Sequence, residues 1–260
     1  MEQSPTIASN ATKLSGNWAK QSIQFSRNRP VVHIFIQLLP NTAKVTMASD
    51  VYNFEDHDFK LGSLQFTGQK KAATVYPNGR SQSLKEACNL LGRLTNSITS
   101  ESKLILLNVS RKDEEVLFNL LKSVDKSFSD IVLIDLFNLR RQDELIDILN
   151  SFGYINNLFI RQHDADEEGH FLMKTVAKMD AYCLFLYVEG GHVMDIGIGI
   201  LQKWKAIPNK ESKRVCITER RFLGRAILDT KSAEVRQYGK VKMEQSKDPD
   251  NPYLCLHFGY

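Results

Sequence analysis

Short apolar runs alternate with amphipathic segments through the middle and C-terminal parts of the chain. The apolar runs have the length of strands, and we expect strands at 104–109, 131–136, 158–160 and 182–188, with a weaker one at 215–217. The segments between them carry apolar residues at helical spacing, and acidic residues such as Asp113 and Asp143 precede them, as is common at helix starts. The pattern predicts repeated strand and helix units from residue 104 onward.

The first third of the chain has a different character. Short β-prone runs are separated by turn signals such as Pro40-Asn41 and Gly68. A helix is expected from Ser83 to Leu94, with Ser81 or Ser83 as its N-cap. The expected strands of this part are 31–39, 43–47, 59–66 and 72–76.

The same pattern divides the chain into three parts. Residues 1–29 are rich in Ser, Asn, Gln and Thr, which indicates a flexible N-terminal arm. Residues 30–99 form a β-rich region with one helix, and residues 100–260 form a strand and helix repeat domain that closes with a hairpin.

Two columns of residues emerge when the expected strands are aligned. The first is aliphatic and is expected to face the helices, at spacings of 27, 26, 26 and 31 residues: Leu107, Ile134, Ile160, Leu186 and Ile217. The next residue of each strand points to the opposite face, because side chains alternate along a strand. This second column is polar: Asn108, Asp135, Arg161, Tyr187 and Thr218.

A polar column favours a sheet with one open face. A sheet covered on both faces gives strands that are apolar throughout, whereas a solenoid carries its helices on one face. The repeat length also falls within the roughly 20 to 29 residues of leucine-rich repeats. We therefore predict an α/β leucine-rich-repeat-like solenoid, with parallel strands on one face, helices on the other and an irregular β-rich N-terminal region. The alternative is a doubly wound sheet with helices on both faces.

Composition excludes several classes of function. The 34 basic and 30 acidic side chains give a net charge of +4 and are interspersed, which argues against nucleic-acid binding. The four cysteines form no CxxC pair and no Cys/His cluster, so no structural zinc site is expected. No apolar run suits a membrane span or a signal peptide. We expect a cytoplasmic or nuclear protein with no membrane partner.

The C-terminal part resembles a known family. A helix ends in Leu201, two further residues and Trp204, and a strand follows at 213–217. The tail, with 236–239 before Val241 and then 254–258, is similar to a closing hairpin. In these features the segment from residue 104 to the end resembles the F-box-associated (FTH/FBA-like) region of large nematode families, in which degenerate leucine-rich-like repeats follow an F-box.

This resemblance implies substrate recognition linked to a ubiquitin ligase. In the family, the F-box holds the ligase adaptor and the repeats hold the substrate. Residues 1–50 depart from that pattern, because Leu38-Leu39-Pro40 is followed by a β-prone run and not by a helical bundle. With no recognisable F-box, the element that would bind the adaptor is missing from the pattern.

Three segments with candidate chemistry are better explained by structural roles. The glycines near Gly190-Gly191 lack the GxGxxG or GxxxxGK[ST] spacing of a phosphate loop. The acids and imidazoles at 163–170 lack the spacing of a cation loop and suit a helix N-terminus. The basic run at 203–225 has few aromatic neighbours for stacking on bases. Since there is also no GxSxG elbow, we expect a protein that is not an enzyme, with no cofactor and no metal.

We expect a module that binds another protein. The candidate binding residues are the polar column, exposed on the concave face of a short horseshoe: Asn108, Asp135, Arg161, Tyr187 and Thr218. Rigid repeats would hold these side chains at fixed separations and limit the ordering entropy of binding. The alternative is a doubly wound α/β enzyme or small-molecule-binding domain. Its site would lie at the carboxyl ends of the strands, near Ser110, Phe137, His163 and Glu189.

Overall fold

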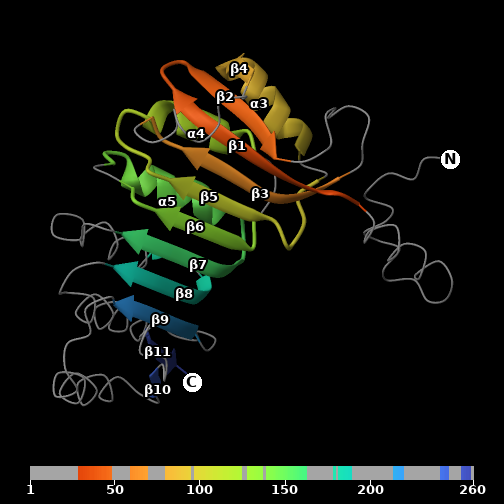
Figure 1. Cartoon of the computed structure of the whole chain (residues 1–260). Helices are drawn as coiled ribbons and strands as arrows, with labels where there is room; N and C mark the ends of the chain where they lie inside the picture. The colour runs from red at the N-terminus through yellow and green to blue at the C-terminus, as the bar shows by residue number, and fades with distance from the viewer. Residues whose placement is uncertain are drawn as a thin grey trace, which may run out of the picture.

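The computed structural model describes eleven stretches of the chain: 29–48, 59–69, 80–94, 97–124, 128–136, 139–162, 178–179, 181–188, 213–219, 241–245 and 253–258. Of these, 47–48, 162, 186–188 and the last three stretches are described by their backbone alone. The described residues form one sheet with helices packed against it (Figure 1). Within them, no helix combines the length and the apolar character needed to cross a membrane.

A tight hairpin begins the sheet. Strands β1 (Val31–Leu39) and β2 (Thr42–Ala48) are joined by Pro40 and Asn41, and Asn41 has a left-handed φ of 58°. Proline suits the first position of such a turn, and asparagine tolerates the second. Strands β3 (Lys60–Thr67) and β4 (Arg80–Ser83) follow. The strands predicted at 31–39, 43–47 and 59–66 are therefore confirmed to within about a residue, while 72–76 lies outside the described residues.

Helix α3 (Leu84–Arg93) begins at a capping box. The Ser83 hydroxyl accepts the Glu86 N–H at 3.3 Å, and the Glu86 carboxylate accepts the Ser83 N–H at 2.8 Å. These bonds satisfy donors that the first turn of a helix leaves without partners. The predicted helix is confirmed, with Ser83 as its N-cap.

The remaining elements are β5 (Lys103–Leu107), α4 (Glu114–Lys122), β6 (Asp130–Ile134), α5 (Gln142–Ser151), β7 (Ile155–Gln162), β8 (Ala181–Val188), β9 (Lys213–Glu219), β10 (Val241–Gln245) and β11 (Tyr253–Phe258). From β5 to β7 strands and helices alternate as the periodicity predicts, and the described elements after β7 are strands. Strands β5 and β6 each end two residues before their predicted limits. Asn108 and Asp135 therefore lie just beyond the strands that were expected to contain them.

The described strands belong to a single mixed sheet, in the order β10-β11-β9-β8-β7-β6-β5-β3-β1-β2-β4. From β9 to β1, each strand is parallel to its neighbour. Antiparallel strands extend the sheet at both edges. Figure 1 shows α3, α4 and α5 on one face of the sheet, with the opposite face turned toward the viewer.

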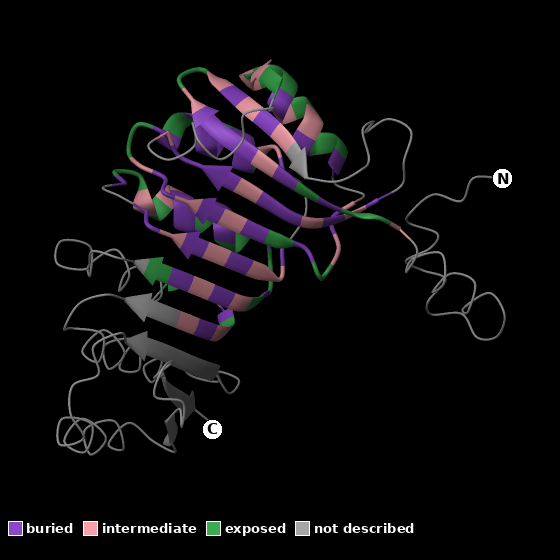
Figure 2. Cartoon of the chain, in the orientation of Figure 1, coloured by how far each residue is buried: buried purple, intermediate pink, exposed green. Residues whose placement is uncertain are grey.

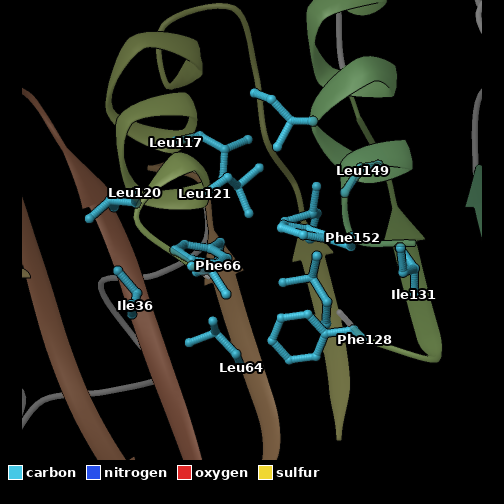
Figure 3. Close-up of a cluster of buried hydrophobic side chains, with 14 of the residues drawn as sticks. Ile36, Leu64, Phe66, Leu117, Leu120, Leu121, Phe128, Ile131, Leu149 and Phe152 are labelled. Carbon is cyan, nitrogen blue, oxygen red and sulfur yellow. The ribbon is translucent and has the colours of Figure 1, made fainter. Parts of the chain in front are cut away.

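An apolar column lies beneath these helices. Leu106, Leu133 and Ile160 are cross-strand neighbours, and each is 3% exposed or less. Leu106 also pairs with Phe66 of β3, which is fully buried. Burying such side chains is the main favourable contribution to folding. Figure 3 shows apolar side chains of α4, of α5 and of the residue that follows α5, which pack in this core: Leu117, Leu120, Leu121, Leu149 and Phe152.

The opposite face carries a row of half-buried apolar side chains. This open-face row consists of Ile105, Val132, Phe159 and Phe185, which are neighbours across β5, β6, β7 and β8. The rings of Phe159 and Phe185 are stacked, with centroids 4.4 Å apart. Figure 2 shows buried and intermediate residues alternating along these strands on the visible face. None of the helices described in the structure covers the row.

The predicted leucine-rich-repeat-like solenoid is wrong. In a solenoid each unit contacts only its neighbours in sequence, but here β3 lies between β1 and β5, and β2 and β4 lie beyond β1. The N-terminal region is β-rich as predicted but is not irregular, because its four described strands belong to the same mixed α/β sheet. Alternating strands and helices fit both architectures, so the prediction depended on the polar column.

The predicted aliphatic column contains an error of register at β7. Leu107 pairs with Ile134 as expected, but Ile134 pairs with Arg161 and not with Ile160. Ile160 belongs to the buried column beside Leu133. The position beside Leu133 is apolar in either register, because Phe159 and Ile160 are both apolar, so the sequence alone does not fix the register.

Charged side chains link α4 to the start of α5 at the surface. Glu144 accepts hydrogen bonds from Lys122 at 2.8 Å and from Arg141 Nε at 2.6 Å. The hydrogen bond from Lys122, and after it the one from Arg141, hold the pKa of Glu144 below its ordinary value. The Arg141 guanidinium also lies 4.8 Å from the centre of the Phe118 ring.

Replacing Glu144 by glutamine is expected to lower the free energy of unfolding by less than about 1 kcal/mol at pH 7, because the ion pairs are partly exposed. A carboxylate with a lowered pKa stabilises the fold above its unfolded pKa, and this contribution is lost as the pH falls through the folded pKa. Urea unfolding of both proteins at pH 7 and at about pH 3 should show the difference shrinking in acid. A difference that does not change with pH would contradict ion pairing as its cause.

Candidate functional site

Three parallel strands end side by side at one edge of the sheet. The residues that follow β3, β5 and β6 are Gly68, Asn108 and Asp135. The N–H of each donates to a carbonyl of the next strand: Gly68 to Leu107 at 3.0 Å, Asn108 to Ile134 at 2.9 Å and Asp135 to Arg161 at 2.9 Å. The ladder thus extends one residue past the strands and fixes three consecutive turns in the same register.

Asn108 and Asp135 both leave the sheet through a left-handed backbone, each with φ of 50°. This conformation costs a non-glycine residue about 1–2 kcal/mol, and Asn and Asp tolerate it best. It turns the chain away from the strand toward α4 in one case and α5 in the other. Both residues are buried, with 6% and 4% of their surface exposed.

Gly68 lies against the turn that follows β5. A Cβ at this position would stand 2.0 Å from the carbonyl oxygen of Asn108 and 2.8 Å from Oδ2 of Asp113. No side chain fits there, since the first of these atoms belongs to the backbone. The end of β3 is therefore packed directly on the Asn108 turn and the Asp113 carboxylate.

Ser110 and Asp113 form a polar pair at this edge. Oδ2 of Asp113 accepts the Ser110 N–H at 2.8 Å and the Ser110 hydroxyl at 2.7 Å. Oδ1 is buried, and none of the described residues donates a hydrogen bond to it. Asp113 is 1% exposed, whereas Ser110 is half-buried. The pair therefore combines a buried acceptor oxygen of Asp113 with a half-buried serine.

The first turn of α4 adds further carboxylates. Glu114 is 5% exposed, and its Oε1 accepts the N–H of Arg141 at 3.1 Å, which ties α4 to the start of α5. Glu115 is exposed on the same turn. Acidic side chains at a helix N-terminus interact favourably with its unpaired amides. Asp113 itself makes no side-chain cap for α4, because its carboxylate turns back to Ser110.

The structure separates the predicted binding column into two groups. Asn108 and Asp135 lie at the carboxyl edge described above, one position beyond β5 and β6. Arg161, Tyr187 and Thr218 lie within β7, β8 and β9, where they are cross-strand neighbours. Arg161 is exposed, so a surface role remains a prediction for it, while burial removes Asn108 and Asp135 from the outer surface.

Of the alternative site, Ser110 lies at this edge, and Phe137, His163 and Glu189 lie outside the described residues. Sequence reasoning used Asp113 only as a helix start and Gly68 only as a turn. A signal was present in the spacing of Ser110 and Asp113, since a hydroxyl three residues before an acid at a helix start can reach its carboxylate. In the part of the chain that the structure describes, no three His, Cys, Asp or Glu side chains gather to hold a metal ion.

Part of the fold is similar to that of a solved protein. No family model matches the chain, and no curated protein matches it. A solved protein-(glutamine-N5) methyltransferase (release factor-specific) from Alicyclobacillus acidocaldarius is similar over 68% of this chain and 90% of its own, with 10% identity and a TM-score of 0.26. Nothing about a reaction or a substrate follows from a likeness at this TM-score.

Two further expectations are corrected by these findings. The prediction that the chain is not an enzyme is corrected: the solved protein named above is a methyltransferase, and the absence of a catalytic motif from the sequence does not exclude catalysis. The description as an F-box-associated, leucine-rich-repeat-like protein is contradicted as well, because the fold is a single mixed α/β sheet.

Proposed function

We propose that this chain binds a small molecule at the carboxyl ends of β3, β5 and β6, above Ser110 and Asp113. In open α/β sheets, ligands bind outside the carboxyl ends of the parallel strands. The observation that supports the proposal most strongly is the buried Oδ1 of Asp113, which no described residue satisfies. A ligand that donates a hydrogen bond to this oxygen would complete its coordination.

The polar edge carries a cost in folding free energy, and this cost supports a role in function. Leaving a buried polar atom without a partner costs about 1–3 kcal/mol, and more when the group is charged. Two left-handed residues, Asn108 and Asp135, add to the cost at the same edge. An aspartate at the start of α4 could instead have capped the helix and gained stability. Unfavourable local features that gather at one edge of a sheet are typical of binding sites.

A ligand screen with a blocking variant tests the proposal. We expect ligand-observed NMR with the wild-type chain to find small molecules that lose at least about tenfold in affinity, or about 1.4 kcal/mol, in Ser110→Tyr. The bulky ring would occupy the half-buried position above Asp113. Asn119→Tyr, at an exposed position on the outer side of α4, is the matched control and should retain binding.

Thermal unfolding of both tyrosine variants must first show that each is folded. Ligands that bind wild type, Ser110→Tyr and Asn119→Tyr equally would place the site elsewhere. A screen of several hundred fragments without any ligand sensitive to Ser110→Tyr would refute the proposed function.

We also propose a second role, protein binding at the open-face row. Its support is the half-buried apolar row of Ile105, Val132 and the stacked pair Phe159 and Phe185, which no described helix covers. Aromatic and aliphatic side chains that are only half-buried are typical of the centre of protein interfaces. A partner on this face would contact the middle of the strands, and a ligand at the carboxyl edge would not, so the amide spectrum of the ¹⁵N-labelled chain can distinguish the two roles.

A further inference from the structure

We infer that the small molecule held at the carboxyl edge carries a protonated primary amine, which donates to Oδ1 of Asp113. This inference rests on the proposed function and names the class of ligand for that site. The polar atoms in the buried part of the site support the inference, because they are hydrogen-bond acceptors and need a ligand that donates.

The two oxygens of Asp113 have different surroundings. Oδ2 is already occupied by the N–H and the hydroxyl of Ser110. Oδ1 is buried and receives no donor from the described residues. A carboxylate oxygen binds only donors, and an ammonium group offers three of them together with the opposite charge.

A backbone acceptor lies close to this carboxylate. The carbonyl oxygen of Asn108 and Oδ2 of Asp113 both approach the single point where a Cβ of Gly68 would stand, at 2.0 Å and 2.8 Å. The absence of a side chain at Gly68 therefore lets a carbonyl and a carboxylate come together at one place. The carbonyl adds its negative potential to that of the carboxylate, which favours a positively charged donor at Oδ1 over a neutral apolar group.

An anionic ligand does not suit the buried part of this edge. A phosphate at a helix N-terminus needs free amides and no competing negative charge. Here Asp113, Glu114 and Glu115 occupy the start of α4. Arg111 and Lys112 precede them, but both side chains are exposed, where water and salt screen their charge. The buried carboxylate of Asp113 is screened far less and therefore decides the sign of the ligand.

Calorimetric titration with matched probes tests this inference. The probes are n-butylamine, phenethylamine and putrescine, each compared with its counterpart in which every amine is acetylated, and inorganic phosphate. We expect at least one amine to bind saturably and its acetylated counterpart to bind at least about tenfold more weakly, because acetylation removes the charge and two donors. Phosphate should not bind.

Two variants with the same change of charge locate the contact. Asp113→Asn should weaken amine binding at least about tenfold, whereas Glu115→Gln, on the exposed side of the same turn, should change it less than about twofold. Circular dichroism and thermal unfolding check that both variants fold. Should Asp113→Asn fail to fold, loss of amine binding in Ser110→Tyr supplies the same test.

The outcomes separate this inference from the proposed function. Neutral or anionic ligands that are sensitive to Ser110→Tyr, found in a protein that binds none of the amines, would overturn the inference and leave the proposed function standing. Amine binding that is equal in wild type and Asp113→Asn would also overturn it. If no ligand of any class is sensitive to Ser110→Tyr, both fail.

Discussion

Replacing Gly68 by alanine is expected to lower the free energy of unfolding by about 3 kcal/mol or more. The new methyl group would stand 2.0 Å from the carbonyl oxygen of Asn108, a backbone atom held by the hydrogen-bond ladder. Relief requires the end of β3 and the turn after β5 to separate, which would break the N–H bond from Gly68 to Leu107. Urea unfolding monitored by circular dichroism measures the change.

Gly92 provides the matched control. It lies exposed in α3, where the nearest atom to an added Cβ is a backbone oxygen of Ser123 at 4.0 Å. Alanine is a better helix former than glycine, so Gly92→Ala should raise stability by about 0.5–1 kcal/mol. Equal stability of Gly68→Ala and wild type would show that the end of β3 is not packed on the Asn108 turn.

Two adjacent residues of β6 should respond very differently to truncation. Leu133 is 1% exposed beneath the helices, and Leu133→Ala should cost about 2–5 kcal/mol through lost burial and the cavity that remains. Ile134 is half-buried on the opposite face, and Ile134→Ala should cost about 1 kcal/mol. The contrast arises because neighbouring side chains of a strand point to opposite faces.

The two variants test which face of β6 is packed against the helices. The predicted column placed Ile134 toward the helices, which would make Ile134→Ala the more damaging change. Urea unfolding of both variants under identical conditions shows whether Leu133 or Ile134 faces the helices. A larger loss in Ile134→Ala would contradict the packing of α4 and α5 on the Leu133 face.

Features set by local chemistry could be predicted from the sequence. The Pro40-Asn41 turn joins two β-prone runs, and the Ser83 capping box starts α3, as short-range signals indicate. The alternation of strands and helices from residue 104 to 162 was also predictable, since each element has its own periodicity.

The order of the strands was not predictable in the same way. The insertion of β3 between β1 and β5 depends on pairing between segments far apart in the chain, and periodicity carries no information about such pairing. Register failed for a related reason, because β7 contains Phe159 and Ile160 side by side and either would satisfy an apolar column.

The candidate site was predicted in part. Asn108 and Asp135 were identified as polar residues on the open face of the expected strands, but they lie one position beyond β5 and β6, where a left-handed backbone accompanies their burial at the sheet edge. Asp113 was recognised as a helix start. That its carboxylate turns back to Ser110, and that Gly68 admits the close approach, depends on tertiary packing between β3 and the turn after β5.

The most direct test of binding at the carboxyl edge is a titration of the ¹⁵N-labelled chain with a ligand from the screen, followed through its amide spectrum. The largest shifts are expected at Gly68, Ser110 and Glu114, where the strand ends meet the start of α4. Shifts concentrated at Ile105, Val132 and Phe159 would contradict a site at the strand ends and would place the ligand on the open face.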